Sequence, residues 1–413
     1  MKILSHYNII LFFSICATII FFLPEASISL DKAKENNIAL NTTSTSTNNL
    51  SSTTENVSIS NRYKAIHIYT PKEVRALYLS GWGAGSNVVR DRVVKTITNS
   101  QANNTKGLNA IVIDIKDYTG YISFNLDNSM KDMDYDYGNI FEVGNTSKKI
   151  DNIYKIIESM HDKNIYVIGR IAVFQDPYMP RHNTDMALKD IYGNMWKDKK
   201  SLTWVDPSNR DYWKYIVNLS KYSHDIGFDE INLDYIRYPT DGNINIIKLG
   251  LASGTTKYNV INNFYQYVGQ ELKNYVPLSA DLFGLVTASE DDLGIGQKME
   301  SGLLNFDFIS PMIYPSHYGA GFKGISDPDA NPKATIRATM SDAYKKVNVL
   351  ASSTNKDSKI YWDKMRPWIQ DFSLRSVYGI KEVNGQIEAL RELGINSYLI
   401  WNASNVYTQG VTY

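Results

Sequence analysis

The feature that most constrains this chain is an alternation, from Val74 onward, between short hydrophobic runs and longer amphipathic segments. Eight of the short runs are rich in β-branched or aromatic residues, a composition that favours strands. Strands separated by amphipathic helices predict repeated strand–helix units, and eight such units predict a closed (β/α)8 TIM barrel of the α/β class. The predicted strands cover residues 74–80, 110–116, 165–173, 228–236, 278–283, 308–314, 365–370 and 397–401.

The segments between the predicted strands have helical spacing. In residues 148–161, Ile150, Ile153 and Ile157 recur at intervals of three and four and predict an amphipathic helix. Only 12 residues follow Trp401, so we expect the last helix of the barrel to be missing or replaced by an upstream segment. The barrel domain is predicted to span residues 66–413.

The N-terminal region has a different composition. Lys2 precedes an apolar run over residues 9–23, as in a secretory signal. The run is shorter than the roughly 20 residues of a spanning helix, yet no A-x-A cleavage site follows it, so residues 1–26 are predicted to be a signal peptide or a membrane anchor. Residues 27–65, rich in Ser, Thr and Asn, are predicted to be a flexible linker. We therefore expect an extracytoplasmic protein, secreted or anchored to the membrane only through this segment.

Charge and cysteine content exclude several classes of function. Lys and Arg together number 43, as do Asp and Glu, so no basic surface for nucleic acid is indicated. The single cysteine, Cys16, lies in the apolar run, which excludes disulfide and thiolate chemistry in the folded domain. The six histidines show no metal-ligand spacing, and we expect neither a metal nor a cofactor. The sequence does not predict an oligomeric state.

The predicted fourth strand carries the strongest candidate for catalysis. It reads G-F-D-E-I-N-L-D-Y-I-R-Y-P over residues 227–239, and its period of two places Glu230, Asn232 and Asp234 on one face. That polar face must point into the barrel. Asp234 lies at the carboxyl end of the strand, where the active sites of barrels lie, and is the first catalytic candidate. Glu230 lies deeper, and we favour a structural role for it.

Two further acids end predicted strands. The second strand reads I-V-I-D-I-K-D over residues 111–117, and alternation places Asp114 and Lys116 on one face. The fifth strand places a single acid, Asp281, near its end. Asp114 and Asp281 are therefore candidate catalytic residues beside Asp234. The alternative is that these acids are core carboxylates, with Asp234 paired to Lys116 or Arg170.

Aromatic and donor side chains lie near the same strand ends. Aromatic residues make up 12% of the chain, which suits stacking against sugar rings, although a Tyr-rich core would give the same composition. The candidate substrate-binding residues are Tyr314, Trp401, Arg237, Lys116, Tyr78, Trp82 and His317. For Tyr314 and Trp401, packing is as good an interpretation as a sugar platform. Two long loops, residues 117–146 and 174–207, follow the second and third strands and are predicted to shape the site.

Glycoside hydrolysis needs two carboxyl groups that flank the scissile bond, and the predicted barrel mouth offers them. Five motifs carry a resemblance to the glycoside hydrolase barrels of bacteria, a family named from fold and motif and distantly similar to the α-amylase superfamily. They are V-R-A-L-Y-L-S-G-W (74–82), A-I-V-I-D-I-K-D (110–117), the fourth-strand motif above, S-A-D-L-F-G (279–284) and F-I-S-P-M-I-Y-P-S-H-Y (308–318). The resemblance covers residues 74–403 and implies a barrel with a carbohydrate site.

In amylase-like barrels the fourth-strand acid is the nucleophile and a fifth-strand Glu is the proton donor. The resemblance therefore implies Asp234 as the nucleophile, whereas the fifth strand has Asp281 where the family has Glu. We expect a retaining glycosidase in which Asp234 attacks, Asp281 is the acid/base and Asp114 holds a sugar hydroxyl. The substrate is expected to be an extracytoplasmic polysaccharide or cell-envelope glycan. One alternative is a catalytically inactive barrel that binds glycan, and another is a lipid- or surface-anchored structural protein, which would have its strand-end acids salt-bridged and no open pocket. An inverting Asp114–Asp234 pair also stays open on spacing.

Overall fold

The computed structural model describes residues 65–413 except 104–105, 129, 131–136 and 143–144. The predicted signal peptide or anchor (1–26) and, apart from residue 65, the predicted linker (27–65) lie outside the described residues. Among the helices that the structure does describe, none is both long and apolar enough to cross a membrane.

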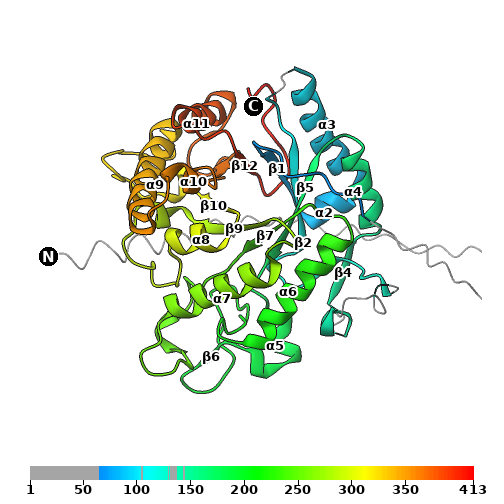
Figure 1. Ribbon diagram of the computed structural model, residues 1–413, viewed down its shortest axis with the longest axis vertical. Helices are drawn as coiled ribbons and strands as arrows, with labels where there is room; N and C mark the ends of the chain where they lie inside the picture. Colours follow the sequence, from blue (N-terminus) through cyan, green and yellow to red (C-terminus); the bar gives the residue numbers. More distant parts are fainter. Residues whose placement is uncertain (1–64, 104–105, 129, 131–136, 143–144) are drawn as a thin grey trace, which may run out of the picture. The chain divides into compact units, whose positions relative to one another are not determined.

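Eight parallel strands close into a barrel, as predicted. Each strand pairs with the next along the chain, and the first pairs with the last, Leu77 lying opposite both Ile111 and Ile400. Helices surround the strands (Figure 1). The barrel strands are β1 (Arg75–Leu79), β2 (Ala110–Lys116), β5 (Tyr166–Ala172), β7 (Glu230–Asp234), β9 (Leu278–Phe283), β10 (Phe308–Met312), β11 (Trp368–Gln370) and β12 (Tyr398–Trp401).

A helical segment follows every barrel strand except β12. The α-helices are α2 (Gly81–Gly85), α3 (Asn87–Asn103), α4 (Ile153–His161), α5 (Met179–His182), α6 (Arg210–Asp225), α7 (Lys257–Leu272), α8 (Met299–Asn305), α9 (Pro332–Thr354), α10 (Ser358–Trp362) and α11 (Ile380–Glu392). After β12 the described chain forms no further helix, which agrees with the predicted lack of the last helix. The residues after β12 instead return to β1, where the Asn405 amide and the Tyr407 hydroxyl donate hydrogen bonds to the carbonyl of Tyr78.

Extra elements fill the connections at the carboxyl ends of the strands. They are β3 (Ile122–Phe124), η2 (Gly138–Phe141), β4 (Thr146–Ile150), η3 (Thr184–Met186), β6 (Lys189–Asp190), η4 (Ile244–Ile246), β8 (Ile247–Lys248), η5 (Gly284–Thr287) and η6 (Pro315–His317). Strand β4 takes the first residues of the helix predicted over 148–161, which begins only at Ile153. The prediction was wrong there because Asn152 accepts a hydrogen bond from the amide of Lys155 and caps the helix at that point.

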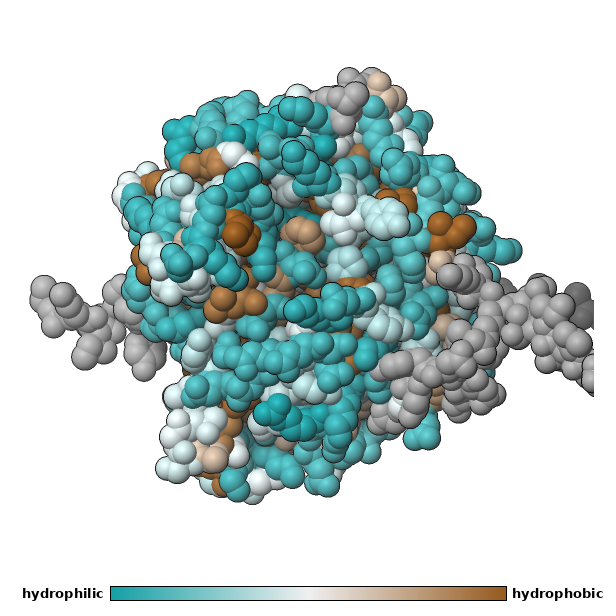
Figure 2. Space-filling model, viewed as in Figure 1, coloured by the Kyte–Doolittle hydropathy of each residue, from teal (hydrophilic) through white to brown (hydrophobic). Residues whose placement is uncertain are grey.

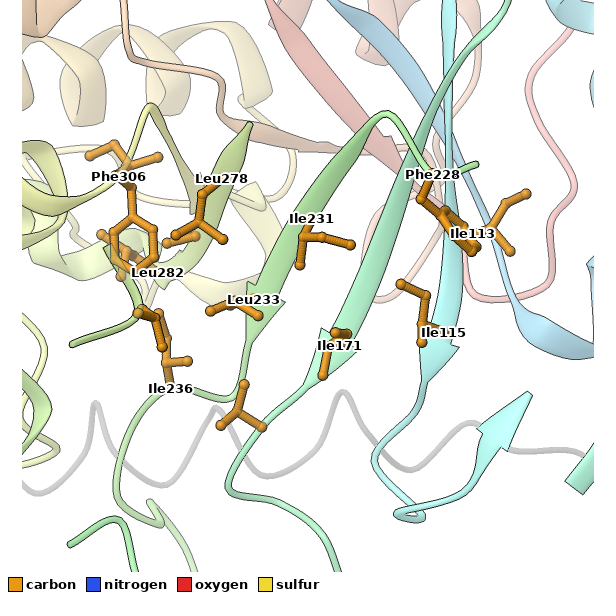
Figure 3. Close-up of a cluster of buried hydrophobic side chains, with 14 of the residues drawn as sticks. Ile113, Ile115, Ile171, Phe228, Ile231, Leu233, Ile236, Leu278, Leu282 and Phe306 are labelled. Atoms are coloured by element: carbon orange, nitrogen blue, oxygen red, sulfur yellow. The ribbon is translucent and has the colours of Figure 1, made fainter. Parts of the chain in front are cut away.

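The main core lies between the strands and the helices. Hydrophobic side chains on one face of neighbouring strands form it, as Figure 3 shows for β2, β5, β7 and β9. Ile231 and Leu233 of β7 are fully buried there, and burying an aliphatic side chain of this size stabilises the fold by about 1.5 to 3 kcal/mol. The residues that alternate with them, Asn232 and Asp234, consequently face the barrel interior.

A β-bulge in β2 changes which residues face inward. Asp114 lies opposite Arg170 while Lys116 lies opposite Ile171, so Ile115 is the extra residue. Gly169 makes room for it, because a Cβ atom at residue 169 would lie 2.3 Å from Cδ1 of Ile115. The bulge turns Lys116 away from the interior. The prediction that Asp114 and Lys116 share a face was wrong because simple alternation does not survive an inserted residue.

The amino-terminal end of the barrel interior is closed by an ion pair. Nη1 of Arg366 donates to both carboxylate oxygens of Glu230 at 2.8 Å, and Glu230 also accepts from the hydroxyls of Tyr166 and Ser279. This agrees with the structural role predicted for Glu230. Apolar side chains such as Val112 and Ile168 pack in the interior, with Ile168 opposite Glu230 in the strand register. Nearer the carboxyl ends of the strands, buried charged side chains follow, among them Arg170 and Asp234.

Candidate active site

One guanidinium, that of Arg170 on β5, organises the acids at the carboxyl ends of the barrel strands. Its Nη1 lies 2.7 Å from Oδ1 of Asp114, its Nη2 lies 2.5 Å from Oδ2 of Asp234, and its Nε lies 3.7 Å from Oδ2 of Asp281. Burial lowers the pKa of Arg170, but the neighbouring carboxylates outweigh it and hold this pKa well above its usual range. The structure therefore brings the three predicted acids together.

Asp114 is held from two sides. The hydroxyl of Tyr78 donates to Oδ2 at 2.6 Å, while Arg170 donates to Oδ1. Burial raises the pKa of Asp114 even against Arg170, because only 2% of the residue is exposed. An acid fixed through both oxygens is better suited to binding than to attack.

Asp234 is positioned by its own backbone as well as by Arg170. The amide of Tyr235 donates to Oδ1 at 2.6 Å, and Tyr235 has a φ of 52°, in the left-handed region that non-glycine residues avoid. Such a conformation costs about 1 to 3 kcal/mol and persists only where the surroundings require it. The unfavourable conformation is at Tyr235, the residue whose amide holds the carboxylate of Asp234.

The surroundings of Asp281 also raise its pKa. Burial, together with the charge of Asp234, raises the pKa of Asp281 well above its ordinary value. Its Oδ1 accepts from the amide of Asn232 at 3.0 Å and from the indole of Trp368 at 2.7 Å. Asp281 is thus a buried acid that keeps its proton to a higher pH than an exposed aspartate does.

Aromatic rings wall the site on the side of β1, β11 and β12. Trp401 stacks on Tyr78 with ring centroids 4.0 Å apart, and Trp368 packs edge-on against Trp401 at 5.6 Å. The guanidinium of Arg170 lies 5.3 Å from the Trp401 ring. Trp401 is partly exposed, so one side of this stack is accessible.

Tyr314 and His317 follow β10, the strand next to β11, and Tyr314 belongs to the same buried cluster as Tyr78 and Trp368. Tyr314 is 6% exposed, and burial followed by the charge of Asp281 raises its pKa well above the usual range. The rings of Tyr314 and His317 are 5.1 Å apart, and Phe372 packs edge-on against Tyr314. Burial lowers the pKa of His317 to about 4, so this ring is neutral at neutral pH.

Two predicted binding residues lie away from the acids. Lys116 is completely buried and pairs with Asp176 at 2.9 Å, beside the hydroxyl of Tyr212 on α6. It therefore ties β2 to the loop and helix that follow β5 and does not join Asp114. Trp82 is 69% exposed on α2, with the ammonium of Lys149 5.6 Å from its ring centroid.

The face shown in Figure 2 is largely hydrophilic, with hydrophobic residues in small separate patches.

The loop over residues 174–207 packs against its neighbours as well as forming part of the rim of the barrel. Trp196 and Trp204 are almost fully buried, and their indoles donate to the carbonyl of Asn243 and the carboxylate of Asp198. Arg237, predicted to bind substrate, lies over the ring of Trp204 at 5.2 Å. The loop therefore supports the rim next to β7.

The pairing of Asp234 with Arg170, which the sequence analysis gave as the alternative to a catalytic role, is present in the structure. Sequence reasoning missed that Arg170 contacts all three acids, and it missed the part played by Trp368. The alternation that singled out Asp234 also places Arg170 inward on β5, so the same argument applied to I-G-R-I-A would have found it. Trp368 carried no such signal, because its indole reaches across β10 to Asp281 on β9. Among the described residues, no group of three His, Cys, Asp or Glu side chains has the arrangement of a metal site.

The sequence also matches a known family. Residues 76–407 fit the model of the family described as "Putative glycosyl hydrolase domain". The chain belongs to this family. The match spans all eight barrel strands except Arg75, the first residue of β1, and the resemblance identified from the motifs is confirmed. The distant similarity to the α-amylase superfamily stays a prediction. None of the curated proteins compared with the chain matches it.

Solved structures also resemble the chain. The glycoside hydrolase domain of PgaB (BpsB) from Bordetella bronchiseptica is 11% identical, with a TM-score of 0.54 over 81% of this chain and 95% of that one, and shares the barrel fold. A hypothetical protein from Ruminiclostridium thermocellum ATCC 27405 is 33% identical, with a TM-score of 0.41 over 53% of this chain and 98% of that chain. The spore cortex-lytic enzyme SleL from Bacillus cereus is 12% identical, with a TM-score of 0.43 over 82% of this chain and 73% of that chain.

Proposed function

We propose that this protein is a retaining glycosidase that acts on an extracytoplasmic polysaccharide or cell-envelope glycan through Asp234 and Asp281. The observation that carries the proposal is the difference between two neighbouring acids. Asp234 shares two hydrogen bonds with a guanidinium that stabilises its charge, whereas burial and the charge of Asp234 hold the proton on Asp281. Glycoside hydrolysis requires a proton donor beside a carboxylate that attacks, and these surroundings suit Asp281 to the first role and Asp234 to the second.

The reaction has two steps, in which Asp234 is the nucleophile and Asp281 is first the acid and then the base. Asp234 attacks the anomeric carbon while the bond to the leaving oxygen breaks, and Asp281 transfers its proton to that oxygen. The Asp281 carboxylate next takes a proton from water, whose oxygen displaces Asp234 from the anomeric carbon. Oδ2 of Asp234 and Oδ2 of Asp281 lie 3.2 and 3.7 Å from the same nitrogen of Arg170, so these two oxygens are at most 6.9 Å apart, a range that includes the spacing of about 5 to 5.5 Å in retaining pairs.

The remaining side chains bind the sugar. Asp114, fixed by Tyr78 and Arg170, accepts a hydrogen bond from a hydroxyl. The partly exposed face of Trp401 offers a stacking platform beside the acids, and the exposed ring of Trp82, which lies away from them, offers one to a more distant unit of the glycan. The export of such an enzyme is supported by the apolar run over residues 9–23, which has the form of a secretory signal.

A second function, glycan binding without hydrolysis, is favoured by one specific observation. All three acids contact Arg170. The same ion pairs would be expected if the acids only supported the aromatic rings of a binding surface and took no part in catalysis. Glycan binding needs the aromatic rings and the hydrogen-bond donors but no proton transfer. A hydrolysis assay therefore distinguishes the two functions, because only the glycosidase releases product.

The test is the Asp234→Ala variant of the full chain, assayed against a panel of glycans. We expect turnover to fall by at least about 1,000-fold, because the covalent intermediate can no longer form. Azide should partly restore turnover of an activated substrate and give a glycosyl azide of inverted configuration. The matched control is Asp211→Ala, which removes an exposed carboxylate from α6 and should leave turnover unchanged.

Two kinds of result would contradict the proposed function. Full activity in Asp234→Ala, or a first product with inverted anomeric configuration, would refute the assignment of Asp234 as the nucleophile. Glycan binding by the wild type with no hydrolysis of any substrate would support the inactive binding barrel instead.

A further inference from the structure

The guanidinium of Arg237 lies in a cage of aromatic rings at the rim of the barrel. It is 5.2 Å from the centroids of Trp204 and Tyr235 and 4.6 Å from that of Phe283. These rings come from three connections, since Trp204 follows β5, Tyr235 follows β7 and Phe283 ends β9. Phe283 lies two residues after Asp281, on the same face of β9 and one pleat nearer the rim. The cage is therefore next to the candidate acids.

The positive charge of Arg237 has no carboxylate within ion-pair distance in the described part of the chain. Arg237 is 8% exposed and donates one hydrogen bond, to the carbonyl of Tyr238 at 3.0 Å. The other two deeply buried arginines of the barrel interior, Arg170 and Arg366, both hold carboxylates. A buried charge without a counter-ion is costly, and the π faces of the rings offset only part of that cost. Burial accordingly lowers the pKa of Arg237.

The nearby acids act on Arg237 only from beyond ion-pair distance. They are Asp234, Asp241 and Asp198, of which Asp234 is already held by Arg170 and Asp198 accepts from the indole of Trp204. A neutral sugar hydroxyl would accept an N–H from Arg237 but would leave its charge uncompensated. A carboxylate would accept two parallel N–H bonds from the planar fork and cancel the charge at once.

We propose that Arg237 binds the carboxylate of an acidic sugar, so that the glycan recognised by this site carries uronic-acid-type units. The inference rests on the proposed function, because it assigns a substrate class to the same site. It adds specificity to that function, since a neutral glycan of the same linkage would leave the caged guanidinium unpaired.

The test compares acidic glycans with neutral counterparts of the same backbone. Polygalacturonate, alginate and hyaluronan, together with their carboxyl-reduced forms, are titrated into the full chain, and dissociation constants and product release are measured. We expect at least one acidic glycan to bind about 10- to 100-fold more tightly than its reduced form, as charge-assisted bidentate bonds do. Arg237→Gln should abolish this preference, and Arg237→Lys should keep part of it because the charge remains.

The matched control is Arg210→Gln. Arg210 also stacks on a tryptophan, 3.7 Å from the ring centroid of Trp213, but lies exposed at the start of α6, and its loss should leave the preference intact. Thermal unfolding of each variant checks that it folds. If Arg237→Gln does not fold, the preference for acidic glycans is compared between the wild type and Arg237→Lys.

A preference for acidic glycans that survives Arg237→Gln would overturn the proposal. So would equal binding of acidic and reduced glycans by the wild type, with hydrolysis intact, and in that case the proposed function would stand. If no glycan of either kind were bound or hydrolysed, the proposed function would fall together with this inference.

Discussion

At the scale of single residues, Arg170 controls the site because three acids depend on it. Each of these acids is at least nine-tenths buried, so each relies on a nearby cation or hydrogen-bond donor. Removing one partner of a buried ion pair costs more than the pair contributes, because the other charge stays behind without compensation. Arg170 is consequently the residue whose loss should affect stability and chemistry together.

Arg170→Met keeps much of the side-chain volume but removes the charge. We expect the free energy of unfolding at neutral pH to fall by about 3 to 5 kcal/mol, since Asp114 and Asp234 lose their shared partner. Urea denaturation measures the change. Arg210→Met, at an exposed site, is the control and should shift the unfolding free energy by less than about 0.5 kcal/mol. A similarly small change in Arg170→Met would show that the acids do not depend on this guanidinium.

Asp281→Asn should separate stability from activity. The folded protein raises the pKa of Asp281 above its ordinary value of 3.8, so the unfolded chain loses this proton first as the pH rises. Wild-type stability is then lost between pH 3.8 and the raised pKa, a loss that an asparagine does not suffer. The amide oxygen of the introduced side chain can still accept the hydrogen bonds that Asn232 and Trp368 donate.

We therefore expect the Asp281→Asn variant to be at least as stable as the wild type at about pH 7, with its relative stability increasing from about pH 4 upward. Its turnover should be lost, because no proton donor remains. Urea denaturation at several pH values gives the first quantity and glycan hydrolysis the second. A variant that is less stable near neutral pH than in acid, relative to the wild type, would contradict the raised pKa.

At the scale of elements, the β-bulge in β2 shows where prediction from sequence succeeds and where it stops. Hydrophobic runs and alternation predicted all eight strands and the inward direction of Asp114, Asp234 and Asp281, because burial on two faces leaves few other arrangements. Alternation failed at Lys116, since the bulge depends on a gap that Gly169 leaves on the neighbouring strand. Such complementarity between strands is a tertiary property and has no counterpart in the local pattern.

Gly169→Ala tests this fit directly. The new Cβ would lie 2.3 Å from Cδ1 of Ile115 and 2.8 Å from the ring of Phe228, so we expect a loss of about 1 to 3 kcal/mol in unfolding free energy. Ile115→Val, which removes the closest atom, should recover part of the loss when the two changes are combined. Gly250→Ala serves as the control because its Cβ meets nothing within 4 Å. Strictly additive effects of the two substitutions would argue against the contact.

At the scale of the whole molecule, Asp229 fastens the incoming chain to the amino-terminal end of the barrel. Its oxygens accept hydrogen bonds from the amides of Ile68 and Val167, both at 2.8 Å, and lie 2.9 Å from Nε2 of His161 on α4. Burial alone would raise the pKa of Asp229, but its bonds with His161, His67 and Val167 outweigh burial and lower it. Three separate parts of the chain meet at this one carboxylate.

Because the pKa of Asp229 is lowered on folding, its contribution is complete above the ordinary value of 3.8 and is lost as the pH falls through the folded value. We expect Asp229→Asn to lose about 1 to 3 kcal/mol of unfolding free energy at about pH 7, with the difference from wild type shrinking toward about pH 3. Chemical denaturation at the two pH values measures it, with Asp211→Asn as the exposed control. A difference that grows in acid would contradict the lowered pKa.

The pairing of β1 with β12 has a consequence for how the protein forms. Val74 and Ser397, joined by a hydrogen bond, are 323 positions apart in the sequence, and the stacked rings of Tyr78 and Trp401 lie beside that seam. Contacts between such distant segments are costly in loop entropy and tend to form late in folding. A nascent chain can therefore complete most of its strand–helix units on the ribosome and still lack the aromatic wall formed by Tyr78 and Trp401. Glycan binding should appear in refolding as the last and slowest event, in step with closure of the seam.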